Sequence, residues 1–158
     1  MPARAHDVPA PRLLYLVKQL ESAIRARMDV ALRSRRITVP QYTALTVLEQ
    51  HDDMSAAQLA RHTFVTAQAM DGVVGALQKA GLIERHRDPE NRRRLVISLT
   101  QAGRALLEDC RADIDRIEAV AFAALTIEQR TRLSEWLGES RRALAAESRN
   151  LPRYDQVP

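Results

Sequence analysis

The sequence predicts a mainly α-helical protein with one small β-hairpin. Apolar residues recur at intervals of three and four along most of the 158 residues, as they do in amphipathic helices. Residues 82–99 instead alternate apolar and polar positions around a turn sequence, Asp88-Pro89. The chain also has only five glycines, which argues against a turn-rich all-β fold.

The composition indicates one domain, or one domain with appended helices, and no membrane association. Hydrophobic residues make up 46% of the chain and aromatic residues only 4%, so the core should be aliphatic. No run approaches the ~20 apolar residues that cross a bilayer, and the first residues do not resemble a signal peptide. The single cysteine, Cys110, excludes an internal disulfide. We therefore expect a cytoplasmic protein.

The basic residues are almost all arginines. The net charge is +4, and Lys18 and Lys79 are the only lysines among the 24 basic residues. Guanidinium groups form planar forks that match phosphates and base edges, which makes nucleic acid a candidate partner. A genomic bias toward arginine would explain the same count, so composition alone does not decide between the two.

The first part of the chain predicts a flexible arm and two helices. Residues 1–11 contain three prolines and read as a loose N-terminal arm, and residues 12–34 form an amphipathic helix. The basic connector at 33–38 is expected to be solvated. Thr38 can cap the next helix, with Pro40 in its first turn.

A helix-turn-helix follows. Ser55 and Gln58 form a capping box at the start of a short helix. After a tight turn, Thr66 can cap another helix that runs to Ala80 and is closed by Gly81. A short helix, a three-residue turn and a second helix are typical of DNA-binding proteins.

The hairpin completes a winged helix-turn-helix. Its strand candidates are residues 82–87 and 94–99, and five arginines lie between 85 and 94. In such an arrangement the second helix presents its N-terminal turn to the DNA major groove. The grouped arginines of the hairpin, the wing, can then reach neighbouring phosphates or the minor groove.

Two long helices follow the wing. Thr100 can begin the first, which runs to about Ala124, and a capping box at Thr126 and Gln129 opens the second. Together with the first helix they carry more apolar surface than one small domain can cover, so we expect a homodimer. The predicted domains are a DNA-binding domain at 38–100, a helical dimerisation domain at 12–37 and 101–149, and a tail at 150–158.

At these residues the chain resembles the MarR family of bacterial regulators, over about 12–146. The matching stretches are "ITVPQYTALTVL", "MSAAQLARHTFVTAQAMDGVVGALQKAGLIERHRDPENRRRLVISLTQAGRALL" and "LTIEQRTRLSEWL". The resemblance implies a homodimer that binds a pseudo-palindromic operator in double-stranded DNA. It further implies repression of its own or a neighbouring operon, relieved by a small phenolic or carboxylated ligand.

The resemblance also assigns residues to DNA. Carried over by position, the DNA-facing residues of the helix-turn-helix and the wing are Ser55, Thr66, Gln68, Ala69, Asp71, Arg92, Arg93 and Arg94. Two departures matter. Asn91 replaces an aspartate that commonly fixes the wing loop, and the second helix of the motif lacks Lys or Arg around Gly72. Base readout then falls mainly to Gln68, Thr66 and apolar contacts with thymine methyl groups, and affinity depends on the wing and on Arg61.

The resemblance places a ligand pocket where the first, second and fifth helices meet. Arg12 could pair with a ligand carboxylate, and Tyr15 or Tyr42 could stack on a ligand or hydrogen-bond to it. Each of these residues is at least equally well explained as an ordinary surface or core residue.

Two alternatives remain open. A redox-sensing regulator would use Cys110, although its place on an apolar helix stripe favours a buried core thiol. A winged-helix protein-interaction module without specific DNA binding is the other alternative, and the neutral second helix of the motif is the feature that keeps it open. No nucleophile–base set, phosphate-binding glycine loop or metal-ligand spacing is present, so we expect no enzyme, no metal and no cofactor.

Overall fold

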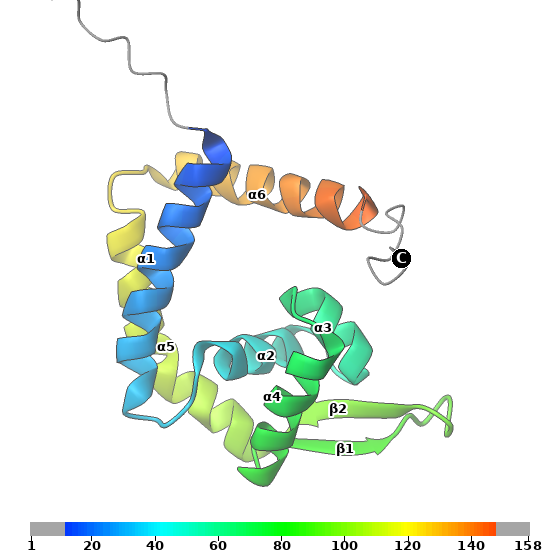
Figure 1. Ribbon diagram of the computed structural model, residues 1–158. Helices are drawn as coiled ribbons and strands as arrows, with labels where there is room; N and C mark the ends of the chain where they lie inside the picture. The colour runs from blue at the N-terminus through cyan, green and yellow to red at the C-terminus, as the bar shows by residue number, and fades with distance from the viewer. Residues whose placement is uncertain (1–11, 148–158) are drawn as a thin grey trace, which may run out of the picture. The chain divides into compact units, whose positions relative to one another are not determined.

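The structure, a computed structural model, describes residues 12–147 (Figure 1). The described elements, in chain order, are α1 (Leu13–Arg33), α2 (Val39–Gln50), α3 (Ala56–Thr63), α4 (Ala67–Lys79), β1 (Ile83–Arg87), β2 (Leu95–Leu99), α5 (Gln101–Ala121) and α6 (Ile127–Glu147). The chain divides between Ile117 and Glu118 into two compact units. The predicted arm at 1–11 and tail at 150–158 lie outside the described residues.

Side-chain caps define the starts of α2 and α3. Thr38 accepts a hydrogen bond from the Gln41 backbone, and the Gln41 side chain accepts one from the Thr38 backbone. Ser55 and Gln58 make the same reciprocal pair at α3. Each box satisfies two backbone donors that a helix otherwise leaves unpaired. The predicted capping of both helices is confirmed.

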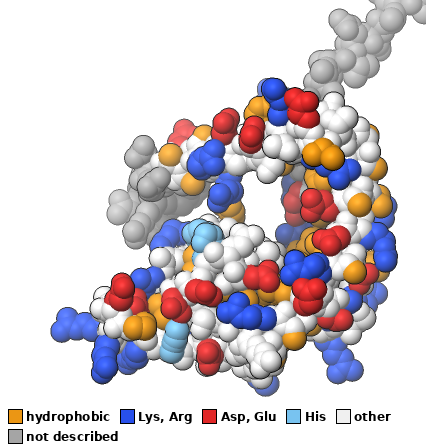
Figure 2. Space-filling model, turned by 180° about the vertical axis from the view of Figure 1, so that it is seen from behind, with side chains coloured by type: hydrophobic (Ala, Val, Ile, Leu, Met, Phe, Trp, Pro, Cys, Tyr) orange, Lys and Arg blue, Asp and Glu red, His pale blue; other side chains and the backbone are white. Residues whose placement is uncertain are grey.

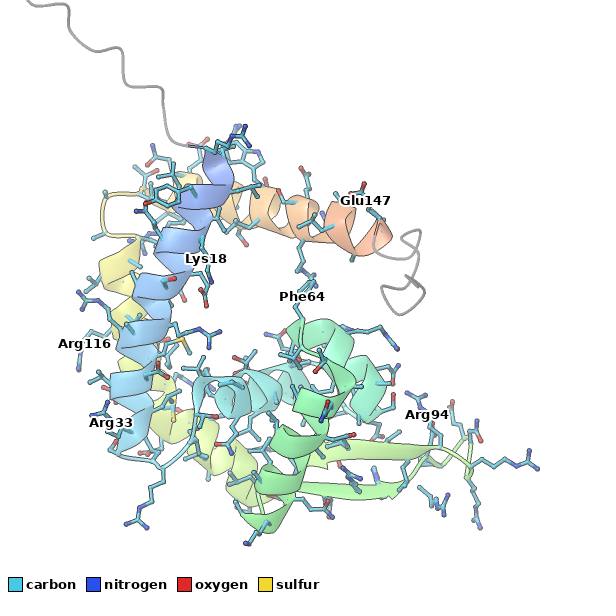
Figure 3. The ribbon with its side chains drawn as sticks, viewed as in Figure 1. Lys18, Arg33, Phe64, Arg94, Arg116 and Glu147 are labelled. Atoms are coloured by element: carbon cyan, nitrogen blue, oxygen red, sulfur yellow. The ribbon has the colours of Figure 1, made fainter. Side chains whose placement is uncertain are left out.

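The turn from α3 to α4 is tight and contains an unusual residue. Phe64 has a φ of 55°, in the left-handed region, where a bulky residue is strained. Its side chain is 63% exposed and stands on the turn in Figure 3. Thr66 then caps α4 by accepting from the Ala69 backbone, and Gly81, with a φ of 72°, follows the end of that helix. Both predicted ends of α4 are confirmed.

The hairpin has the predicted strands. β1 and β2 pair antiparallel, with Ile83 opposite Leu99 and Arg87 opposite Leu95. The inward side chains Ile83, Ile97 and Leu99 are buried. One face of the hairpin therefore anchors to the core while its loop extends away from it (Figure 1).

The main core lies within the first unit. It joins α2, α3, α4, both strands and α5 through a cluster of buried side chains: Ala44, Leu45, Leu48, Met54, Leu59, Ala60, Met70, Val74, Leu77, Ile83, Ile97, Leu99 and Leu107. These side chains are aliphatic, as the low aromatic content predicts. This packing holds the helix-turn-helix and the hairpin together as one body.

The start of α5 is fixed to the end of α4. Thr100 donates its backbone N–H to the Leu82 carbonyl and its hydroxyl to the Gly81 carbonyl. Gly103 lies so close to this joint that an added Cβ would overlap the Leu82 carbonyl oxygen. A glycine is therefore required there for α5 to approach the root of the hairpin.

A second cluster joins α1, α2 and α5, and Arg35 clamps it. Leu32, Val39 and Cys110 are its buried members. Arg35 Nε contacts Asp109 Oδ2 at 2.9 Å, and its Nη1 contacts Asp113 Oδ2 at 2.5 Å. These carboxylates raise the pKa of Arg35. The expectation of a solvated connector is wrong for this residue, because α5, distant in sequence, supplies both partners.

Long apolar faces remain open in the single chain. The large hydrophobic side chains exposed on α1 are Leu13, Leu14, Tyr15, Leu16, Val17, Leu20 and Val30, and those exposed on α6 are Ile127, Trp136, Leu137 and Leu144. These faces belong to the region that the sequence assigns to dimerisation. Across residues 12–147, no helix is both long and apolar enough to span a membrane.

Candidate nucleic-acid interface

The first turn of α4 presents the predicted contact residues together. Gln68, Ala69 and Asp71 are exposed, whereas Met70 on the opposite side is buried. The hydroxyl of Thr66 caps the helix, so the helix N-terminus is well ordered. The core thus orients α4 so that its N-terminal turn faces solvent, as binding in a major groove requires.

The rest of the exposed face of α4 is small and nearly neutral. Gly72 and Gly75 have open space where a side chain would lie. Asp71 and Lys79 are the only charged residues between Ala67 and Lys79. Attraction for phosphates must therefore come from neighbouring elements.

The loop of the wing is held by its own hydrogen bonds. The Asp88 backbone N–H donates to the Arg94 carbonyl, and the Asn91 N–H donates to the Asp88 carbonyl. The Asp88 carboxylate accepts from the Glu90 backbone, and the Asn91 side-chain oxygen accepts from the Arg93 backbone. Asn91 and Asp88 together close the loop. The loop therefore has internal hydrogen bonds although residue 91 is not an aspartate.

The three wing arginines have two different environments. Arg92 and Arg93 are exposed at the loop, and basic side chains gather at this end of the molecule (Figure 2). Arg94 is half-buried (labelled in Figure 3) and contacts both the Asp88 carboxylate and the Gln58 side-chain oxygen. Arg94 therefore connects the wing to the cap of α3. The side chains of Arg92 and Arg93 remain exposed and can contact a binding partner.

The predicted residues of α3 also differ in environment. The Ser55 hydroxyl accepts from the Gln58 backbone and donates to the Gln58 side chain, so it is already engaged within the protein. Arg61 is exposed in the last turn of α3. Of the two predicted residues, Arg61 is therefore the one whose side chain is exposed to solvent.

The loop between α2 and α3 contacts both strands of the wing, which the sequence did not predict. His86 Nε2 on β1 lies 2.9 Å from Asp53 Oδ1, and Asp53 has a left-handed φ of 59°. The Ile97 backbone N–H donates to the Met54 carbonyl at 2.8 Å. In the part of the chain that the structure describes, no three His, Cys, Asp or Glu side chains form a group that could hold a metal ion.

The structure does not bring the three predicted ligand residues together within one chain. Arg12 and Tyr15 are exposed at the start of α1. Tyr42 is half-buried on α2, and burial raises the pKa of its phenol. Tyr42 and Met28 pack on the same cluster, and Tyr15 precedes Met28 by thirteen residues, about 20 Å along a helix.

Cys110 lies in the core between α1, α2 and α5. It is fully buried, and burial raises the pKa of its thiol. Since the thiolate is the reactive form, this environment does not activate the sulfur.

Comparisons with known proteins find transcriptional regulators. A model of the MarR family matches residues 37–94. The HTH-type transcriptional repressor Rv2887 of Mycobacterium tuberculosis is 35% identical over 133 residues, which cover 84% of this chain and 94% of that protein.

Two crystal structures of Rv2887 share the fold. The complex with DNA gives a TM-score of 0.65 at 32% identity, covering 83% of this chain and 98% of that chain. The complex with salicylic acid gives a TM-score of 0.66 at 34% identity, covering 83% of this chain and 96% of that chain.

Proposed function

The chain belongs to the MarR family of transcriptional regulators, and we propose that it is a repressor whose hold on DNA is released by a small ligand. One observation carries the proposal. The exposed N-terminal turn of α4 and the exposed Arg92 and Arg93 of the wing belong to one packed body. A helix that contacts base edges and a basic loop that is fixed to it can bind adjacent grooves of one duplex.

The two elements have different roles in this proposal. Gln68 and Thr66 contact base edges in the major groove, and Ala69 offers a methyl group to thymine. Arg92 and Arg93 neutralise phosphates beside it or enter the minor groove. Arg61 adds a phosphate contact from α3. These contacts do not require catalysis, and the protein acts in the cytoplasm, where bacterial DNA lies.

The operator-binding form is a homodimer. α1 and α6 expose many large apolar side chains, and grouped apolar surface of this kind marks protein–protein contacts. A second copy of the chain covers these faces with the same faces of its own. The two-fold symmetry of such a dimer matches a pseudo-palindromic operator. The regulated locus is the protein's own operon or a neighbouring one.

The releasing ligand is small and carboxylated or phenolic. Support comes from Rv2887, whose crystal structures include one with salicylic acid. Arg12, Tyr15 and Tyr42 stay candidates for this ligand. Because Tyr15 lies ~20 Å along α1 from the cluster that holds Tyr42, we infer that a ligand meets all three residues where two protomers come together.

Fluorescence anisotropy tests the function. The purified protein is titrated into its own upstream intergenic duplex and into a scrambled duplex, at several salt concentrations. We expect binding to the upstream duplex to be stronger by at least ~4 kcal/mol. Equal, weak and steeply salt-dependent binding to both would instead favour a winged-helix module that recognises another protein.

A further inference from the structure

Asp71 is the acidic residue on the exposed face of α4. It lies three residues after Gln68 and four before Gly75, so these three residues share one side of the helix. The opposite side, with Met70 and Val74, is buried in the core. The carboxylate therefore stands beside Gln68, on the surface that the proposed function places in the major groove.

The structure gives this carboxylate no role within the protein. Asp71 is the fifth residue of α4 and lies beyond the first turn, where a negative charge would stabilise the helix through its dipole. A cation three or four positions away could pair with it, but the residues at those positions are uncharged: Ala67, Gln68, Val74 and Gly75. Among residues 12–147, no side chain forms an ion pair or a hydrogen bond with the Asp71 carboxylate.

An unpaired carboxylate on this face lowers the affinity for DNA of any sequence. It repels the phosphates, whose neutralisation supplies most of the sequence-independent binding. An asparagine, which has nearly the same size, would not have this effect. The negative charge is useful only where a base edge offers a hydrogen-bond donor to it.

The major groove presents two such donors, and their surroundings differ. The N6 amino group of adenine lies between two acceptors, its own N7 and the O4 of thymine, and both repel a carboxylate. The N4 amino group of cytosine has an acceptor, the O6 of guanine, on one side only. A carboxylate therefore favours cytosine over the other three bases.

We propose that Asp71 selects a cytosine in each half of the operator, with its carboxylate accepting a hydrogen bond from the N4 amino group. This assignment rests on the proposed function and adds to it a base that one residue recognises. Gln68 suits adenine and precedes Asp71 by about 4.5 Å along the helix, close to the ~3.4 Å between base pairs. We therefore expect the adenine and the cytosine in neighbouring base pairs.

Selection from a library of random duplexes tests the assignment without knowledge of the operator. The full-length wild type, Asp71→Asn and Asp71→Ala are each used to enrich bound duplexes, which are then sequenced. The wild type should enrich cytosine at one position of each half-site. At that position alone, Asp71→Asn should enrich adenine, because an amide pairs with adenine N6 and N7, and Asp71→Ala should show no preference. Thermal melting confirms that both variants are folded.

A base analogue tests the amino group itself. Fluorescence anisotropy compares the selected operator with a duplex in which the cytosine of one half-site is replaced by 2-pyrimidinone, which lacks the N4 amino group. The wild type should bind the analogue about tenfold more weakly, as expected for loss of one good base contact. Asp71→Ala should bind the two duplexes equally, and it should bind a scrambled duplex more tightly than the wild type does.

Glu90→Gln is the matched control for charge. Glu90 is an exposed acidic residue in the loop of the wing, so its removal also reduces repulsion between the protein and phosphates. This variant should bind the operator and the scrambled duplex more tightly by the same factor. It should keep the preference for cytosine, because it leaves the exposed face of α4 unchanged.

The results separate this assignment from the proposed function. An enriched operator whose base preferences are the same for the wild type, Asp71→Asn and Asp71→Ala overturns the role of Asp71 alone. Equal binding of the wild type to cytosine and to 2-pyrimidinone does the same. If the wild type enriches no sequence, the repressor role fails, and the assignment of Asp71 fails with it.

Discussion

The wing and the exposed face of α4 belong to one compact unit, yet they present opposite chemistry. Five arginines lie between residues 85 and 94, and a network of backbone and side-chain bonds holds the loop that carries three of them. The exposed face of α4 holds two glycines, mostly neutral side chains and the acidic Asp71. The difference indicates that affinity and sequence discrimination reside in separate elements, and each can be changed alone.

Removing the exposed wing charges should have the largest effect. Arg92→Ala with Arg93→Ala should lower affinity for every duplex by about a hundredfold and reduce the salt slope by about 0.9 for each lost phosphate contact. Anisotropy titrations on specific and scrambled DNA over a range of salt measure both quantities. An unchanged salt slope would mean that these arginines do not contact phosphate.

Arg94→Ala should weaken DNA binding by about tenfold, through the position of the wing rather than through a lost phosphate contact. Its partners are Gln58 and Asp88, and loss of a charged hydrogen bond costs about 1.5–3 kcal/mol. Thermal melting should show a destabilised protein, and the salt slope should stay near that of the wild type. A slope lowered as in the double variant would assign Arg94 to DNA directly.

Gln68→Ala should reduce discrimination more than affinity. A paired contact between an amide side chain and adenine contributes about 1–3 kcal/mol of discrimination. The ratio of affinities for the operator and a scrambled duplex should therefore fall by about tenfold, while binding to the scrambled duplex stays constant. Equal losses on both duplexes would show that Gln68 contacts the backbone.

Gly72→Arg should have the smallest effect. It should reduce the difference in charge between α4 and the wing. Open space surrounds Gly72, and replacing a helix-interior glycine relieves about 1 kcal/mol. A new cation on α4 should raise affinity for all duplexes a few-fold and increase the salt slope by about 0.9. Weaker binding would show that the bare helix surface packs closely against DNA.

The sequence predicted what depends on neighbouring residues. Thr38, Ser55 and Thr66 begin their helices as expected, because a cap and its partner lie three residues apart. The turn at Asp88 is predictable for the same reason. The sequence also predicted the order of elements and the face of α4 that meets solvent.

The remaining features depend on residues far apart in the chain. Arg35 pairs with Asp109 and Asp113, more than seventy positions away, and nothing near the connector indicates this. The contact between Arg94 and Gln58 is of the same kind. A cavity that Arg25, Thr63 and Met70 help to line was not predicted either, since four separate segments of the chain form its walls.

The joint at the root of the wing has a consequence for how the protein opens. Thr100, Gly81, Leu82 and Gly103 bind the end of α4 to the start of α5 over a very short distance. The Thr100 amide donates to the Leu82 carbonyl, and the Gly103 amide donates to the Thr100 hydroxyl that itself reaches Gly81, so we expect both amides to become accessible to solvent deuterium when the two helix ends separate. Hydrogen exchange at these two positions should occur in one cooperative step, slower than at the hairpin tip. The end of the wing next to α4 and α5 would then stay rigid, and the motion of the wing would be confined to its loop.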